Sequence, residues 1–148
     1  RGMKNDQECP GRDLEDLSAL IIEFYERLSS WEHDVVRESG LTLPQMHTLE
    51  VLGQCAPLRM KDLAAKMGVT TGTLTMTADR LERRGLLTRA PHASDRRSIL
   101  VSLTEQGRVL FEEHHALHLR LTAELASQLS EQEAETLRGL LARLNQGF

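Results

Sequence analysis

The chain has 148 residues, of which 40% are hydrophobic and 27% are charged, and its formal net charge is −4. These values are ordinary for one soluble globular domain that buries a core of its own. No apolar run approaches the length of a membrane span and no signal peptide is visible, so we expect a cytoplasmic protein without a membrane partner. Two cysteines are too few for a disulfide framework; we expect Cys9 to be an exposed thiol and Cys55 to be a small buried residue.

An apolar seam marks the first predicted helix, over residues 12–38. Its members alternate at spacings of three and four, which is the pattern of a helix that packs against another helix along its full length. A monomer of this size would struggle to cover the seam, so we expect it at a homodimer interface; the alternative is a core within one chain. The seam consists of Leu14, Leu17, Ile21, Phe24, Leu28, Trp31 and Val35.

The segment 60–85 has the pattern of a helix-turn-helix. Gly68 supplies the positive φ that lets a first helix end, Thr70 is a good N-cap for a second helix, and Gly85 ends that helix. Val69 is expected to fill the corner between the two helices. The inward positions are Leu63, Ala64 and Met67 in the first helix, Leu74, Ala78 and Leu81 in the second, and Met46, Leu49 and Leu52 in a preceding helix over residues 42–54.

The outward face of the second helix, residues 71–84, suits the major groove of DNA. Small hydroxyl side chains at a helix N-terminus approach a groove closely and offer methyl groups to thymine, and arginines farther along the helix reach phosphates. The alternative is an ordinary surface helix. Asp79 also lies on this face. Together with Thr70, the candidate DNA contacts are Thr71, Thr73, Thr75, Met76, Arg80 and Arg83.

Residues 86–90 and 98–103 alternate in polarity around a polar turn, which predicts a hairpin with a charged tip. Arg96 and Arg97 lie on this tip, and Asp95 is expected to brace the Arg97 guanidinium through a bidentate ion pair. A pre-aimed arginine on a thin hairpin fits the minor groove, where the potential is most negative. The three residues are therefore candidate DNA contacts; the alternative for Asp95 and Arg97 is a simple surface ion pair.

Basic residues concentrate in this region. Residues 57–104 contain nine Lys or Arg and four Asp or Glu, whereas the rest of the chain contains 9 basic and 18 acidic residues. A basic face on an acidic body favours DNA bound in one orientation, with an affinity that depends strongly on salt.

Two more helices are predicted after Thr104, and Ser130 with Glu133 forms a capping box for the second of them. The chain is therefore expected to be one domain, 1–148, mainly α with a small β-hairpin wing. Residues 43–103 form a DNA-binding winged helix-turn-helix lobe, and residues 12–38 and 104–146 form a helical dimerisation region. The apolar positions of the last two helices are Leu110, Leu117, Leu121 and Leu125, and then Leu137, Leu140, Leu141 and Leu144.

The helix-turn-helix string and the string DRRSILVSLTEQG, residues 95–107, closely resemble the MarR family of bacterial transcription regulators, over nearly the whole chain. The resemblance implies a homodimer whose interface is built by helices from both chain ends. It also implies a DNA-binding regulator, most often a repressor, controlled by a small molecule or a metal. A two-fold dimer places its two DNA-contacting helices about one turn apart, roughly 34 Å, so the expected operator is an inverted repeat of double-stranded DNA. One departure is Arg59, which stands where the family has a capping Ser or Thr.

The histidines suggest an effector. His114 and His118 are four residues apart on a predicted helix, so both imidazoles project from one face. A subgroup of the MarR family that represses zinc-uptake genes has such a pair after two glutamates, and another ligand histidine in the helix before the DNA-binding unit. EEHHALH, residues 112–118, and His47 resemble that pattern, which implies a Zn²⁺ site of His47, His114 and His118. The alternative is a histidine pair at an interface or a surface, and no other cofactor is indicated.

The sequence does not resemble an enzyme, because it has no phosphate-binding glycine loop, no nucleophile elbow and no HExxH motif. The competing function is a dimeric metal-binding or interaction module that does not bind DNA.

Overall fold

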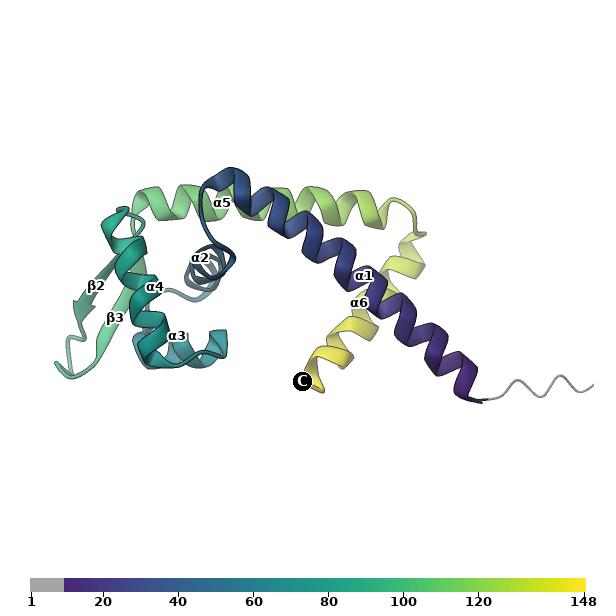
Figure 1. Ribbon diagram of the computed structural model, residues 1–148, viewed down its shortest axis with the longest axis horizontal. Coiled ribbons are helices and arrows are strands. Elements are labelled where there is room, and N and C mark those ends of the chain that lie inside the picture. Colours follow the sequence, from purple (N-terminus) through teal and green to yellow (C-terminus); the bar gives the residue numbers. More distant parts are fainter. Residues whose placement is uncertain (1–9) are drawn as a thin grey trace, which may run out of the picture. The chain divides into compact units, whose positions relative to one another are not determined.

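The computed structural model describes residues 10–148 (Figure 1), so Cys9 lies outside the described residues. Within that range the chain has six helices and three strands. They fall into two compact units, divided between Leu43 and Pro44. In chain order they are α1 (Pro10–Ser39), α2 (Leu43–Cys55), β1 (Leu58–Arg59), α3 (Met60–Met67), α4 (Thr71–Arg83), β2 (Leu87–Pro91), β3 (Ile99–Leu103), α5 (Glu105–Ala126) and α6 (Glu131–Gln146).

The first unit is built on α1, a single helix of 30 residues that ends before Gly40, whose φ is 75°. The predicted seam lies on this helix, and much of it is exposed: Ile21 is 57% accessible and Phe24 is 53% accessible. The helix thus carries a row of accessible large apolar side chains along the predicted seam.

The second unit begins with α2 and the helix-turn-helix. Gly68 has the expected positive φ of 67°, and the Thr70 side chain accepts a hydrogen bond from the backbone N–H of Thr73 at 3.2 Å. Val69 is exposed rather than filling the corner, because the turn is closed by backbone hydrogen bonds, one of which runs from Val69 N–H to the Ala64 carbonyl. The core of the unit includes the predicted inward positions Met46, Leu49, Leu52, Leu63, Ala64, Leu74, Ala78 and Leu81, together with Leu86, Leu87 and Val101.

The predicted hairpin is present as β2 and β3, and a third strand, β1, completes an antiparallel sheet in the order β1-β3-β2. In the register of this sheet, Leu58 of β1 and Arg89 of β2 both pair with Val101 of β3. Two residues are too few to show an alternation of polarity, so the sequence carried no signal for β1. Because β1 leads directly into α3 and pairs with β3, the sheet that forms the wing also holds the start of α3.

Arg59 joins β1 to α3 and occupies the N-cap position of that helix. Its backbone is extended, as an N-cap requires, yet within the described structure its side chain makes no capping hydrogen bond. The side-chain cap that the family's Ser or Thr would supply is therefore missing at this position, and pairing of β1 with β3 restrains the start of the helix instead.

We predict that Arg59→Ser raises the free energy of unfolding by about 1 kcal/mol, because the serine hydroxyl can accept from the free backbone N–H groups of the first turn of α3. Chemical denaturation at one fixed protein concentration measures the change. Arg59→Ala is the matched control, since it removes the same guanidinium without supplying an acceptor. Equal stability of the serine and alanine variants would show that the cap does not form.

The start of α5 packs closely on the segment before the wing. The Thr104 side chain caps α5 by accepting from the Gly107 N–H at 3.0 Å, and its hydroxyl donates to the Gly85 carbonyl at 2.6 Å. A Cβ on Gly107 would lie 1.9 Å from the Leu86 carbonyl oxygen, so only glycine fits there. The wing and the end of α4 are thus fixed to the first turn of α5.

The predicted capping box of α6 is present, with Ser130 and Glu133 bonded reciprocally. None of the residues of α6 is buried, and its leucines Leu137, Leu140, Leu141 and Leu144 are all exposed. Over residues 10–148, no helix has both the length and the apolar character that a membrane crossing needs.

Candidate nucleic-acid interface

The face of α4 that was predicted to contact DNA points outward. Thr71, Thr73, Thr75 and Met76 are exposed at its N-terminal half, and Arg80 and Arg83 are exposed farther along. This arrangement follows from the burial of Leu74, Ala78 and Leu81 on the opposite side. The helix therefore presents its hydroxyl-rich end and its arginines together.

The hydroxyl groups of this face are partly committed to local hydrogen bonds. Thr75 Oγ1 donates to the Thr71 carbonyl at 2.8 Å, and Thr70 Oγ1 donates to Thr73 Oγ1 at 3.0 Å. A threonine that donates to its own helix presents its methyl group and an oxygen lone pair outward. Such a surface suits thymine methyl groups and base amino groups better than it suits phosphate oxygens, which are acceptors.

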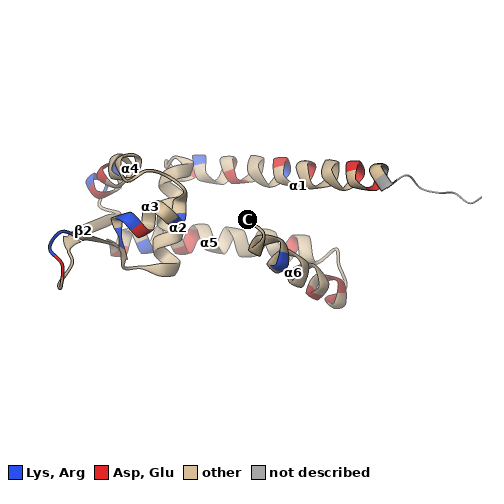
Figure 2. Cartoon of the chain, turned by 90° about the horizontal axis from the view of Figure 1, so that it is seen from below, with Lys and Arg blue, Asp and Glu red and all other residues tan. Residues whose placement is uncertain are grey.

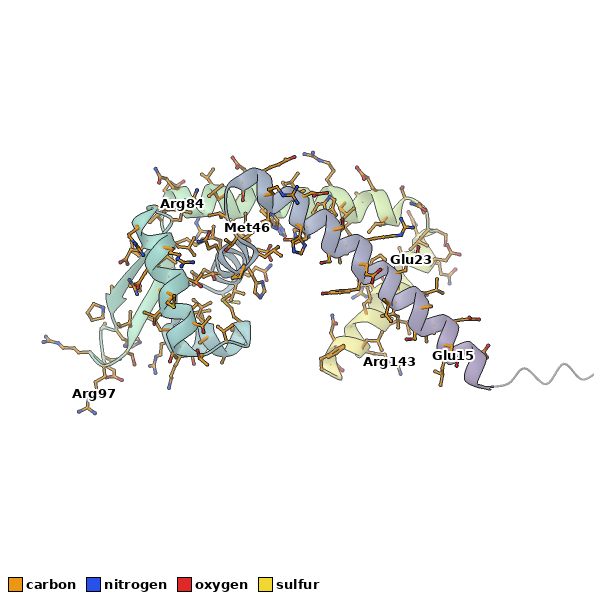
Figure 3. All side chains as sticks on the ribbon, in the orientation of Figure 1. Glu15, Glu23, Met46, Arg84, Arg97 and Arg143 are labelled. Atoms are coloured by element: carbon orange, nitrogen blue, oxygen red, sulfur yellow. The ribbon has the colours of Figure 1, made fainter. Side chains whose placement is uncertain are left out.

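The tip of the hairpin is closed by Asp95 in a different way from the one predicted. Its carboxylate accepts from the backbone N–H of Arg97 at 3.0 Å and from the Ser98 hydroxyl at 3.1 Å. These two hydrogen bonds hold the pKa of Asp95 below its usual value, and the bond from the Arg97 N–H has the larger effect. The predicted brace of the Arg97 guanidinium is therefore wrong, because short side chains at turns bond most readily to nearby backbone groups. Asp95 shapes the tip, from which the Arg97 side chain extends away from the sheet (Figure 3).

Arg89, which was not predicted from the sequence, joins the wing to α4. Its guanidinium contacts the carboxylates of Asp79 and Glu82, and its backbone N–H donates to Glu82 at 3.1 Å. The side-chain hydrogen bond from Arg89 is the main reason why the pKa of Glu82 is lowered. Glu82 therefore stays charged, and the contact persists, until the pH falls below the ordinary range of a glutamate. The sequence did contain a signal for this contact. Arg89 lies two positions after buried Leu87, so its charged side chain is on the same face of the strand.

A hollow of about 290 Å³ lies between the wing, the start of α3 and the N-terminal half of α4. Figure 2 shows basic residues on α3, on α4 and along the hairpin, whereas acidic residues outnumber basic ones along α1. A hollow of this charge is suited to a phosphate backbone that passes between helix and wing. Its walls contain Arg59, Lys61, Arg89 and Arg97, with Thr71, Thr75 and Ser98 as further polar groups.

The three histidines predicted to bind metal are not placed alike. His118 Nε2 lies 3.0 Å from His114 Nε2, so the structure brings this pair together. His47 is set apart from the pair on α2, with its side chain 54% exposed and its Nδ1 3.8 Å from Glu50 Oε2. Glu50 was not predicted, because its approach to α5 depends on how α2 packs. Cys55, predicted to be buried, is exposed at the last turn of α2, where the chain leaves the helix.

Comparison with known proteins shows which family the chain is similar to. The MarR family model matches residues 41–99. The HTH-type transcriptional repressor MdtR of Bacillus subtilis is 29% identical over 133 residues, which cover 90% of this chain and 86% of the relative.

Solved structures agree with this result. The Streptococcus pneumoniae protein FabT in complex with DNA superposes with a TM-score of 0.75 at 27% identity, over 92% of this chain and 94% of that one. A MarR family protein from Bacillus stearothermophilus has the same fold, with a TM-score of 0.84 at 24% identity over 94% and 97% of the two chains. The chain described here is therefore similar to the winged helix-turn-helix transcription regulators of the MarR family, which are not enzymes.

Proposed function

We propose that the protein is a transcription repressor that binds an inverted-repeat operator as a homodimer and that a small molecule or a metal controls this binding. The observation that supports the proposal most directly is the basic hollow beside α4. It places Arg59, Lys61 and Arg97 next to the hydroxyl-rich end of an exposed helix. A nucleic acid complements both features, because its phosphates attract the cations and its groove accommodates small side chains.

In this proposal α4 enters the major groove and the hairpin tip enters the adjacent minor groove. The outward methyl groups and oxygen atoms of Thr71, Thr73 and Thr75 contact base edges, and Arg80 and Arg83 contact phosphates. Arg96 and Arg97 are exposed at the tip, where they can follow a narrow minor groove. That FabT has been solved with DNA, and that MdtR is named a repressor, support this assignment.

The exposed apolar residues of α1 and α6 support the homodimer. Leucines are exposed at every position of the predicted stripe on α6, and Leu17, Ile21 and Phe24 are exposed on α1. Burying such stripes against a second copy removes large apolar side chains from water, at about 25 cal/mol for each Å² of apolar surface. A two-fold dimer then presents two copies of α4 to successive major grooves, roughly 34 Å apart.

An effector can control this dimer if it binds more tightly to one relative placement of the two α4 helices than to another. A shift of a few Å breaks the register of both half-sites at once, so a modest preference is enough to change DNA affinity. A ligand that binds both arrangements equally would change nothing.

The proposal is tested by selection from a random duplex library with the purified full chain, followed by binding measurements at several salt concentrations. Enriched sequences should contain an inverted repeat with half-site centres about one helical turn apart. If each subunit neutralises three phosphates, the slope of log affinity against log salt concentration should be about −5. Failure to enrich any sequence above non-specific binding would instead favour an interaction module that does not bind DNA.

A further inference from the structure

Three side chains from two helices converge at one point of the second unit. Glu50 Oε1 of α2 lies 2.7 Å from His114 Nε2 of α5, and His118 Nε2 lies 3.0 Å from His114 Nε2 and 3.8 Å from Glu50 Oε1. His114 is 3% exposed. The cluster forms part of the wall of a hollow of about 280 Å³, which gives it access to solvent.

We propose that Glu50, His114 and His118 bind a divalent first-row metal ion, with Zn²⁺ as the best match, and that this ion is the effector of the proposed DNA-binding function. The inference about regulation rests on that function, whereas the inference about the metal site does not.

The separations of the three atoms match those in a metal site. A circle through three points with these separations has a radius of about 1.9 Å, and zinc lies about 2.0–2.1 Å from nitrogen and oxygen ligands. The three donor atoms are therefore close enough together to be shared by one ion of this size.

A hydrogen bond accounts for one of these contacts, because 2.7 Å between Glu50 Oε1 and His114 Nε2 is the separation of a charge-assisted hydrogen bond. Each imidazole nitrogen carries either one hydrogen or one in-plane lone pair. A proton on His114 Nε2 would be divided between the Glu50 oxygen and His118 Nε2, which are both acceptors. A proton on His118 Nε2 instead would leave the carboxylate 2.7 Å from a nitrogen lone pair. A cation at the centre is bound by all three lone pairs at once.

The ligand types select the class of metal. Two imidazoles with one carboxylate are a donor set typical of zinc and its first-row neighbours, whereas calcium and magnesium prefer oxygen ligands throughout. Borderline nitrogen donors and a compact site thus favour Zn²⁺.

This ligand set differs from the one suggested by the sequence, because α2 contributes Glu50 in place of His47. His47 lies three residues earlier on α2, and its Nδ1 is 3.8 Å from Glu50 Oε2, the oxygen that does not face His114. At 3.8 Å His47 is too far from Glu50 for a hydrogen bond, and it is not one of the three side chains that converge.

A metal ion at this point would tie α2 to α5. The first turn of α5 is fixed to the wing through Thr104 and Gly107, and α2 contributes Leu49 and Leu52 to the core shared with the helix-turn-helix. An ion that joins the two helices therefore restrains the DNA-binding elements relative to the rest of α5. If only one such arrangement matches the operator, the metal changes DNA affinity.

The test measures metal binding without DNA. Chelator-treated full-length protein is titrated with Co²⁺, whose visible absorption reports its ligands, and then with Zn²⁺ in competition. The wild-type chain should bind one ion per subunit. Glu50→Gln and His118→Gln should weaken binding by more than about 100-fold, and His47→Gln by about 10-fold or less. His115→Gln, on the same helix and stacked on Phe111, is the matched control and should bind like wild type.

Two results would overturn the inference. One is the absence of Co²⁺ and Zn²⁺ binding by the folded wild-type protein at micromolar concentrations. The other is undiminished metal binding by Glu50→Gln together with loss of binding by His47→Gln. Circular dichroism of each variant shows whether it is folded, and His118→Gln is preferred to a change at buried His114 for that reason. DNA binding is measured separately, so a protein that binds its operator but no metal overturns the metal site and leaves the proposed repressor intact.

Discussion

Replacement of Phe24 by glutamate is expected to convert the protein into a monomer and to abolish specific DNA binding. Phe24 lies in the exposed apolar seam of α1 with Leu17 and Ile21, and each of the three is more than half accessible. In a two-fold interface one substitution introduces two carboxylates. A penalty of about 3 kcal/mol for each unpaired charge removed from water would weaken the dimer by roughly ten thousandfold.

Sedimentation equilibrium measures the change in dimer affinity, and anisotropy of a labelled operator measures the loss of DNA binding. Ala19→Glu is the matched control, since it adds the same charge to an exposed position of α1 outside the seam. It should remain dimeric and bind DNA normally. A Phe24→Glu protein that stayed dimeric at nanomolar concentration would show that the seam is not the interface.

The helices and the helix-turn-helix could be predicted because their signals are local and repeated. Leu74, Ala78 and Leu81 recur at helical spacing, and Gly68 and Thr70 mark the turn through their own backbone and side-chain chemistry. Each of these signals lies within a few residues of the structure it specifies. The periodicity of the chain is therefore sufficient to predict the helices and the outward face of α4.

The parts that could not be predicted depend on contacts between elements or on a choice among local partners. Glu50 approaches His114 only because α2 packs beside α5 in the folded unit. Arg89 reaches Asp79 and Glu82 only because β2 lies beside α4. Asp95 had two possible hydrogen-bond donors within Arg97, the backbone N–H and the guanidinium. The carboxylate accepts from the backbone N–H.

Arg89→Ala is expected to reduce operator affinity by about 100-fold although Arg89 need not contact DNA. Its guanidinium holds the carboxylates of Asp79 and Glu82, and it is partly buried between the wing and α4. Removing it leaves two unneutralised carboxylates near the phosphates and releases the wing from α4. Repulsion between these carboxylates and the DNA phosphates, together with a less ordered wing, would cause a loss of about 3 kcal/mol of binding free energy.

The salt dependence separates this role from a direct contact. Arg80→Ala, which removes a phosphate contact in each subunit, should lower the magnitude of the log affinity slope by about 2 for the dimer. Arg89→Ala should lower affinity more while changing this slope less, because its charge is already neutralised by the two carboxylates. Arg108→Ala, an exposed arginine of α5 outside the hollow, is the control and should leave both quantities unchanged. Neutralising Asp79 and Glu82 in the Arg89→Ala background should restore part of the affinity, and a variant that recovered none would show that orientation of the wing, rather than repulsion, dominates.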